Sequence, residues 1–386
     1  MRILFTSLNC LADPSSGAAI SVRTILSMLA ARGHQVMSVT AACFDNAPFE
    51  TEAEMLRWLK FSPNPDGTWS RQDAGISHLC QPAGQTKIPR LTAPNIAQVL
   101  DNVIGPALAF APDVVISYGG SGFEMTMRQK LQDHGAKVAF YLANPSYRTN
   151  DAFAGADIIM TDSAATQDLY QQRQALGSTV IGKFIQRPSV SPHADKSLIT
   201  FVNPTYEKGV TLFYRILEMM KQVLPSARFM VVESRGKLDR IEAETGIPFS
   251  AYNSVRRIGL QMDMAEVFSR TKVLLLPSLW HESGSRTAIE ALSLGIPVLA
   301  SNHGGQPEHL GEGATLINVA PELRENPRLI PPVSAALPWV AMLSDLCRDP
   351  AFYQEKSEAA LAQWALHDPS QRVADLDDLL QRLVAP

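Results

Sequence analysis

Cysteine, positive charge and long apolar runs are all scarce in this chain of 386 residues, and each scarcity excludes a class of protein. The 4 cysteines include no CxxC pair, so the sequence predicts reduced thiols and neither a disulfide framework nor a structural zinc site. The formal net charge of −4 argues against nucleic acid as the principal partner, because phosphate groups need a cationic surface. No apolar run reaches the roughly 18 residues of a membrane-spanning helix.

The first residues also lack the features of an export signal. The segment MRILFTSLNCLADPSSG has a short apolar run that ends in a polar turn, whereas a signal peptide has about 7–15 apolar residues before a small-residue cleavage site. A cytoplasmic location is therefore expected, and peripheral contact with a membrane is left open.

Motifs for metals and common cofactors are missing as well. The one D-x-D pair, Asp375 and Asp377, falls inside a C-terminal amphipathic pattern, where both carboxylates are expected to face solvent. The histidines show no paired metal-binding spacing, and neither a G-x-G-x-x-G loop nor a P-loop is present. No metal and no cofactor are therefore predicted, and a dehydrogenase with a nucleotide cofactor is disfavoured.

Short apolar segments alternate with amphipathic helical segments along the chain, as in parallel sheets covered on both faces. In the first half, the expected strands are 2–8, 34–40, 113–118, 137–142, 157–161 and 179–184. In the second half, they are 198–202, 228–232, 257–259, 272–276, 298–300 and 315–317. The sequence therefore predicts an α/β protein with two doubly wound, Rossmann-like parallel-sheet domains.

The polar segment between the two series predicts a linker, because it contains Pro188 and Pro192. The expected parts are an N-terminal domain 1–187, a linker 188–197, a C-terminal domain 198–368 and a C-terminal helix 369–386. Residues 44–98 have a weaker pattern and are left largely unassigned. In that region FSPNPDGTWS and CQPAGQTKIPR are expected to be loops, and Glu50–Lys60 a short helix.

The segment from Leu274 to Glu308 carries the strongest functional pattern. A buried strand runs into a polar, glycine-containing turn, and a helix is expected to begin near Ser285. The N–H groups and dipole at a helix start suit a phosphate. Glu282 and Glu290, eight residues apart, could accept hydrogen bonds from sugar hydroxyls. Spacing alone leaves open that Glu290 is a solvated helix residue and Glu282 a helix-start carboxylate.

The same segment resembles a known family. ESGSRTAIE, EALSLGIPVLAS and GGQPE are similar to the donor-site signature of the retaining GT-B glycosyltransferases of family four. The resemblance implies two Rossmann-like domains that face a cleft, and a nucleotide-sugar donor bound by the C-terminal domain. It assigns sugar hydroxyls to Glu282 and the ribose to Glu290. It assigns the sugar and diphosphate to the backbone of the turn, which includes Gly284, Ser285 and Arg286.

Two further segments extend the resemblance, each with a departure. ITFVNPTYEKGV resembles the family's diphosphate-binding segment, so Lys208 is expected to hold the diphosphate. The family's arginine falls on Asn203, which is still expected to lie in the donor site, and Arg235 is the candidate replacement for the missing cation. In the N-terminal half, Gly17 matches a glycine-rich loop that faces the diphosphate. A family histidine falls on Asn144, which could hydrogen-bond the sugar or simply form a turn before Pro145.

These observations predict a metal-independent retaining glycosyltransferase that moves a sugar from a nucleotide-sugar donor to an unidentified acceptor. Without a convincing nucleophilic carboxylate in the N-terminal half, we expect front-face substitution, with Glu282, Lys208 and Asn144 nearest the chemistry. Two alternatives stay open: another GT-B chemistry, namely a nucleotide-sugar epimerase or a glycoside phosphorylase, and a two-domain nucleotide-sugar binding protein without turnover.

Overall fold

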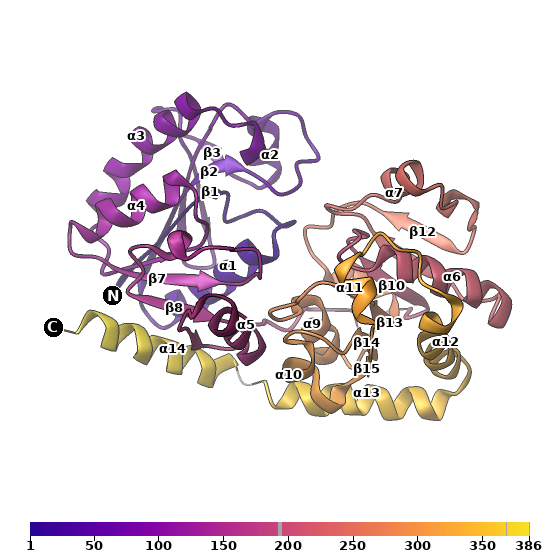
Figure 1. Ribbon diagram of the computed structural model, residues 1–386. Helices are drawn as coiled ribbons and strands as arrows, with labels where there is room; N and C mark the ends of the chain where they lie inside the picture. The colour runs from indigo at the N-terminus through magenta and orange to yellow at the C-terminus, as the bar shows by residue number, and fades with distance from the viewer. Residues whose placement is uncertain (192–194, 368, 386) are drawn as a thin grey trace. The chain divides into compact units, whose positions relative to one another are not determined.

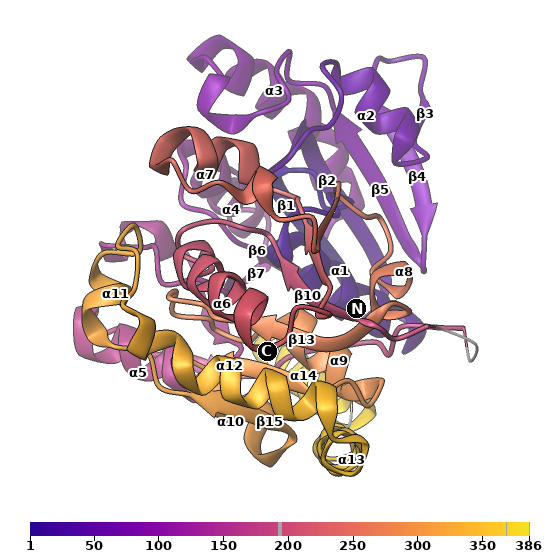
Figure 2. The same ribbon diagram turned by 90° about the vertical axis from the view of Figure 1, so that its right-hand side faces the viewer.

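The computed structural model describes residues 1–191, 195–367 and 369–385, and the chain forms two compact units (Figures 1 and 2). Unit 1 comprises Met1–Phe184 and Pro369–Pro386, and unit 2 comprises Ile185–Asp368. The C-terminal helix α14 (Pro369–Val384) thus belongs to unit 1, although it follows unit 2 in sequence. Pro192, which helped to predict the linker, lies outside the described residues.

The sheet of unit 1 has the strand order β3-β4-β5-β2-β1-β6-β7-β8-β9. Its strands are β1 (Arg2–Asn9), β2 (Gln35–Cys43), β3 (Ser62–Pro63), β4 (Trp69–Asp73), β5 (Ile76–Gln81), β6 (Val114–Ser117), β7 (Lys137–Leu142), β8 (Ile158–Thr161) and β9 (Thr179–Val180). Pairing is parallel from β5 to β9 and antiparallel at the β3–β4–β5 edge. The predicted strands are therefore present, although β9 covers only the start of the expected 179–184.

Helices cover both faces of this sheet, as the alternation of side chains along β1 requires. Ile3 and Phe5 pack in the cluster that includes α1 (Gly17–Ala31) and α14. Leu4 and Leu8 pack in the opposite cluster. That second face carries α3 (Ala93–Phe110) and α4 (Gly122–Gln132), and α5 (Ala164–Gln174) follows β8 (Figure 1). The continuous apolar strands are thus buried on both faces.

Residues 44–98 contain more regular structure than the sequence pattern predicts. The expected short helix is α2 (Glu52–Trp58), which begins with a capping box between Thr51 and Glu54. The prediction that FSPNPDGTWS is a loop is wrong in part, because Ser62–Pro63 and Trp69 pair in the β3–β4 hairpin. CQPAGQTKIPR starts as the end of β5 and becomes irregular only after Gln81, before a 3₁₀ turn over Ile88–Arg90.

The sheet of unit 2 is parallel, with the order β12-β11-β10-β13-β14-β15. Its strands are β10 (Leu198–Val202), β11 (Phe229–Val232), β12 (Val255–Ile258), β13 (Thr271–Leu276), β14 (Val298–Ser301) and β15 (Ala314–Ile317). Its helices are α6 (Val210–Val223), α7 (Leu238–Thr245), α8 (Ala265–Phe268), α9 (Arg286–Ser293), α10 (Gln306–Leu310), α11 (Pro321–Glu325), α12 (Val333–Arg348) and α13 (Pro350–Ala365). Helices α6 and α12 pack side by side (Figure 2). In this order the chain reverses direction across the sheet between β10 and β13, the place where doubly wound folds bind ligands.

The prediction that both carboxylates of the D-x-D pair face solvent is wrong for Asp377. Asp377 is only 3% exposed and accepts bonds from Arg32 Nε at 2.7 Å and His34 Nε2 at 2.9 Å. Burial alone would raise the pKa of Asp377, but the bonds from Arg32, Gln381 and His34 lower it. Asp377 therefore fastens α14 to unit 1.

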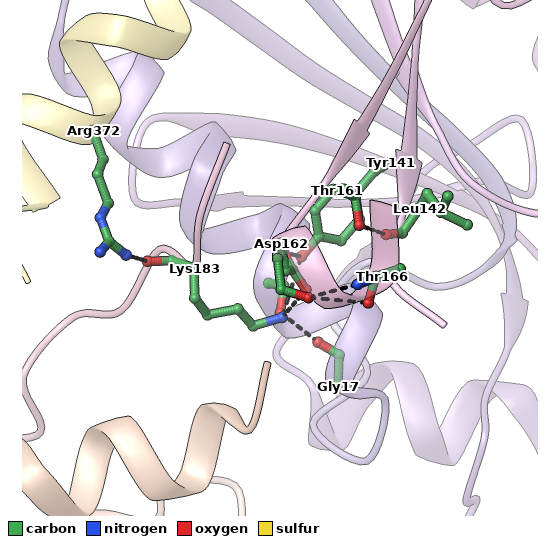
Figure 3. Close-up of polar contacts among 10 residues, drawn as sticks. Gly17, Tyr141, Leu142, Thr161, Asp162, Thr166, Lys183 and Arg372 are labelled. Carbon is green, nitrogen blue, oxygen red and sulfur yellow. Dashed lines mark hydrogen bonds and ion pairs between the residues drawn. The ribbon is translucent and has the colours of Figure 1, made fainter. Parts of the chain in front are cut away.

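A second buried ion pair lies near the end of the N-terminal segment of unit 1 (Figure 3). Lys183 Nζ lies 2.6 Å from Asp162 Oδ2, and the two side chains are 6% and 1% exposed. Tyr141 donates its hydroxyl to the other oxygen of Asp162 at 2.5 Å. Arg372 of α14 donates to the Lys183 carbonyl at 2.8 Å. The cluster therefore binds both the last residues before unit 2 and the returning helix to the core of unit 1.

Candidate functional site

Most of the predicted site residues lie on loops at one edge of the unit 2 sheet. Asn203 and Lys208 follow β10, Arg235 follows β11, and the turn from 277 to 285 follows β13. Because the strands are parallel, their carboxyl ends meet at this edge, which flanks the reversal between β10 and β13. The topology therefore gathers residues from separate parts of the sequence in one place.

Lys208 and Glu282 form an ion pair at this edge. Lys208 Nζ lies 2.5 Å from Glu282 Oε1, and Ser278 donates its hydroxyl to the same oxygen at 2.7 Å. Burial alone would raise the pKa of Glu282, but the Lys208 ammonium, the Ser278 hydroxyl and the charge of Arg235 lower it. Glu282 is therefore an ionised acceptor beside two cations. Ser278 was not predicted, because a serine in a polar turn gives no signal of its own.

The backbone around Lys208 is held by close contacts. Gly209 has φ +81°, and a Cβ there would lie 1.9 Å from the carbonyl oxygen of Pro277. The carbonyl of Glu207 accepts N–H bonds from Leu279 and Trp280. Gly209 is thus required for packing, since only glycine allows the Pro277 carbonyl to come this close. Lys208 provides the charge of the dipeptide.

The Gly-Gly pair of GGQPE packs against the backbone of Glu282. Gly304 has φ +63°, and a Cβ there would lie 2.7 Å from the Glu282 carbonyl oxygen. Gly305 N–H donates to that oxygen at 2.7 Å. His303, just before the pair, contacts Arg324 Nη1 through Nδ1 at 2.8 Å. The segment after β14 therefore packs against the backbone of Glu282. Gly304 allows the close approach, and Gly305 donates the hydrogen bond.

The helix that begins at this turn is α9, with Ser285 at its N-cap in an extended conformation and without a side-chain cap bond. Glu290 is only 8% exposed, and its Oε1 lies 2.9 Å from Arg286 Nη2. The alternative in which Glu290 is a solvated helix residue is therefore wrong. Arg286 was expected to serve through its backbone, and its side chain also holds Glu290.

Asn203 and Arg235 lie in loops that touch each other. The Asn203 side-chain oxygen accepts from Gly236 N–H at 2.8 Å and from the Ser234 hydroxyl at 3.1 Å. Arg235 is exposed between these two donors. Asn203, expected in the donor site, thus has its side-chain oxygen bonded to the loop that carries Arg235.

Gly17 and Asn144 belong to unit 1. Gly17 is the exposed first residue of α1, and a Cβ there would meet no atom within 4 Å. Asn144 Oδ1 accepts the Ser146 N–H at 2.9 Å, and its carbonyl accepts the Tyr170 hydroxyl at 2.8 Å. Asn144 thus forms the turn that the sequence left as one alternative, whereas Gly17 lies at an open helix start.

An apolar cavity of about 430 Å³ also lies in unit 2, between α6, α11 and α12. Its lining includes Leu212, Leu323, Leu329, Ile330 and Pro338, and none of the predicted site residues. Within residues 1–191, 195–367 and 369–385, no cluster of three or more His, Cys, Asp or Glu side chains could hold a metal ion. No helix among these same residues is long and apolar enough to span a membrane.

Comparisons with known proteins identify the fold. The chain is similar to sucrose-phosphate synthase from Thermosynechococcus elongatus, with 16% identity and a TM-score of 0.70 over 99% of each chain. It is also similar to Anabaena HepE solved with UDP and glucose, with 15% identity and a TM-score of 0.69 over 99% of each chain. A UDP-forming α,α-trehalose-phosphate synthase from Burkholderia vietnamiensis matches with 14% identity and a TM-score of 0.62, covering 100% of this chain and 97% of that one. The fold is GT-B.

Residues 183–326 match the family described as glycosyl transferases group 1. This range contains the predicted site residues of unit 2, from Asn203 to the Gly-Gly pair. No curated protein sequence is similar enough to count as a match. The family match and the GT-B fold support a glycosyltransferase.

Proposed function

We propose that the protein is a retaining glycosyltransferase that moves a sugar from a nucleotide-sugar donor to an acceptor without a metal ion. The observation that carries the proposal is the ionised Glu282 paired with Lys208 at the reversal of the unit 2 sheet, with the buried Glu290 on the following helix. The resemblance to family four, with its E-x7-E signature, supports retention of configuration. No finding favours the epimerase, the phosphorylase or the non-catalytic alternative.

Each side chain then has a role in holding the donor. Lys208, with Arg235, neutralises the diphosphate as it leaves, and the start of α9 gives N–H groups to the same charge. Glu282 accepts hydrogen bonds from sugar hydroxyls, and Glu290, held by Arg286, accepts them from the ribose. For Gly17 and Asn144 of unit 1 we keep the roles that the resemblance implies, the diphosphate for the Gly17 backbone and the sugar for Asn144, whose Oδ1 also accepts the Ser146 N–H.

In the front-face step, the bond between the anomeric carbon and the diphosphate oxygen breaks first. The acceptor oxygen then bonds to the same face of that carbon, and the acceptor proton passes to the departing phosphate. Configuration is retained without a covalent enzyme intermediate. The protein's contribution is electrostatic, since its cations stabilise charge on the leaving group.

The donor's base is proposed from structural neighbours. HepE is described in complex with UDP and with UDP-glucose, so UDP and UDP-glucose are the first probes for this chain. A thermal-shift series with UDP, GDP and ADP tests the proposal. A ligand at 100 times its Kd is expected to add about 2.7 kcal/mol of stability. If none of the three stabilises the protein, the donor site is wrongly assigned.

We propose a cytoplasmic location for the protein. The acceptor is still to be identified.

Replacing Lys208 with alanine is expected to weaken UDP binding about 10- to 150-fold, because a charge-assisted bond is worth roughly 1.5–3 kcal/mol. Binding of uridine, which has no phosphate, should change little. Isothermal titration with both ligands measures the difference. The matched control is Lys221→Ala, in the last turn of helix α6, which begins just after Lys208, and this variant should bind UDP as the wild type does. Equal losses for uridine and UDP would remove Lys208 from the diphosphate site.

Activity is expected to survive EDTA, because the proposed leaving-group stabilisation comes from side chains and N–H groups. The measurement is donor turnover after dialysis against EDTA, with and without added Mg²⁺ or Mn²⁺. Loss of turnover in the chelator and its recovery with either metal would contradict the mechanism. Retained UDP binding in the chelator would show that the donor site itself was intact.

A further inference from the structure

Asn203 has an unusual backbone for the residue that directly follows strand β10. Its φ is +60°, in the left-handed region, which costs most side chains free energy but which asparagine tolerates. Its N–H donates to the Val232 carbonyl at 2.8 Å, and its own carbonyl accepts the Thr205 N–H at 2.8 Å. The residue is only 7% exposed. The end of β10 is therefore bonded on both sides in a conformation that few residues adopt.

The Asn203 side chain fixes the neighbouring loop after β11. Its oxygen accepts from the Gly236 N–H and from the Ser234 hydroxyl, the residues on either side of Arg235. A Cβ on Gly236 would lie 2.3 Å from the Pro204 carbonyl oxygen, so the two loops are in backbone contact. The backbone on both sides of Arg235 is thus held by one buried acceptor.

Arg235 follows β11 at the same edge of the unit 2 sheet as Lys208 and Glu282, and its positive charge contributes to the lowered pKa of Glu282. Lys208 contacts that carboxylate directly. Two cations from different loops therefore act on the same carboxylate, and the loop that carries the second cation is the one that Asn203 holds.

We propose that Asn203 is a positioning residue that fixes the Arg235 loop, so that Arg235 serves as the second cation for the donor's diphosphate. This inference rests on the proposed function. Asparagine suits the position because it tolerates a positive φ and offers an amide oxygen to two donors. In this chain one residue thus fixes the loop after β10 and the cation after β11, instead of contacting the phosphate itself.

A double-mutant cycle on UDP binding tests the inference. Asn203→Gly keeps the left-handed backbone accessible but removes the acceptor, and Arg235→Ala removes the cation. Each is expected to weaken UDP binding about 10-fold while leaving uridine binding within about twofold. The double variant should bind no worse than the weaker single variant, because both act through one guanidinium. Ala175→Gly, at φ +51° in unit 1, is the control for relieving a left-handed residue.

Three results would overturn the inference while leaving the proposed function in place. They are unchanged UDP affinity in Asn203→Gly, an additive loss in the double variant, and full UDP affinity in Arg235→Ala when Lys208→Ala is impaired. Failure of the wild type to bind UDP, GDP or ADP would instead refute the proposed function, and this inference with it.

Limited trypsinolysis tests the loop restraint without any ligand. Cleavage after Arg235, followed by mass spectrometry, should be about 10-fold faster in Asn203→Gly than in the wild type, because the loop opens more often. Asn203→Asp, which keeps an acceptor oxygen and tolerates a positive φ, should stay as resistant as the wild type. Equal cleavage of wild type and Asn203→Gly would show that Asn203 does not restrain the loop.

Discussion

Replacing Lys183 with methionine is expected to lower the free energy of unfolding of unit 1 by about 3–5 kcal/mol. The variant leaves the Asp162 carboxylate, whose side chain is 1% exposed, without its ammonium partner in the protein interior. A buried carboxylate that loses its partner is far more costly than the net worth of the pair. The measurement is a urea titration in which hydrogen exchange of the β8 amides is the readout. Because β8 belongs to unit 1, this readout reports the unfolding of unit 1 and not that of unit 2.

Two further variants make this measurement specific. Lys137→Met breaks a pair with Asp157 at 3.4 Å, in which the side chains are 45% and 23% exposed, so its loss should stay below about 1 kcal/mol. Adding Asp162→Asn to Lys183→Met removes the buried charge and keeps an acceptor for Tyr141, so part of the lost stability should return. A loss below about 1 kcal/mol in Lys183→Met would show that the pair does not hold this region together.

The alternation of strands and helices could be predicted because it follows from local periodicity. The parallel strands are buried on both faces and therefore stand out as apolar runs. The antiparallel edge β3–β4–β5 could not be predicted. Strand β4 (WSRQD) is polar and mostly half-buried, and it lacks the alternation of apolar and polar residues that marks a strand with one buried face. The pattern also did not predict helix α3, because Pro106 lies in its interior. Its start is nevertheless encoded locally, by a capping box between Thr92 and Asn95.

The residues of the candidate site could be predicted where they belong to short sequence motifs. The Glu pair, the Lys-Gly dipeptide and the Gly-Gly loop are each short and local in sequence. Contacts between distant residues were not predictable, because nothing in a single sequence pairs Lys208 with Glu282 or Arg32 with Asp377. The conformation of Asn203 belongs with these, since its positive φ is supported by a loop more than 30 residues away.

The two glutamates of the E-x7-E motif should respond differently to substitution. Glu290 is assigned to the ribose, so Glu290→Gln should weaken UDP and UDP-glucose binding by similar factors, about 10- to 100-fold. Glu282 is assigned to the sugar, so Glu282→Gln should lower donor kcat/KM by about 10- to 100-fold or more. Glu282 bonds Lys208 directly, so its loss leaves that ammonium available to the diphosphate. UDP affinity in Glu282→Gln should therefore be unchanged or tighter.

Glutamine is the informative replacement because both glutamates are enclosed and paired, Glu290 with Arg286 and Glu282 with Lys208. It keeps the volume and one acceptor oxygen, whereas alanine would also leave a cavity beside an unpaired cation. Glu312→Gln, at an exposed position of the same unit, is the matched control and should match the wild type in both assays. Melting curves check that all three variants are folded.

If Glu282→Gln weakens UDP binding as much as Glu290→Gln does, the roles are wrongly assigned. If both retain near-wild-type turnover, the pair does not hold the donor, and the resemblance of this helix to a donor site reflects its composition alone.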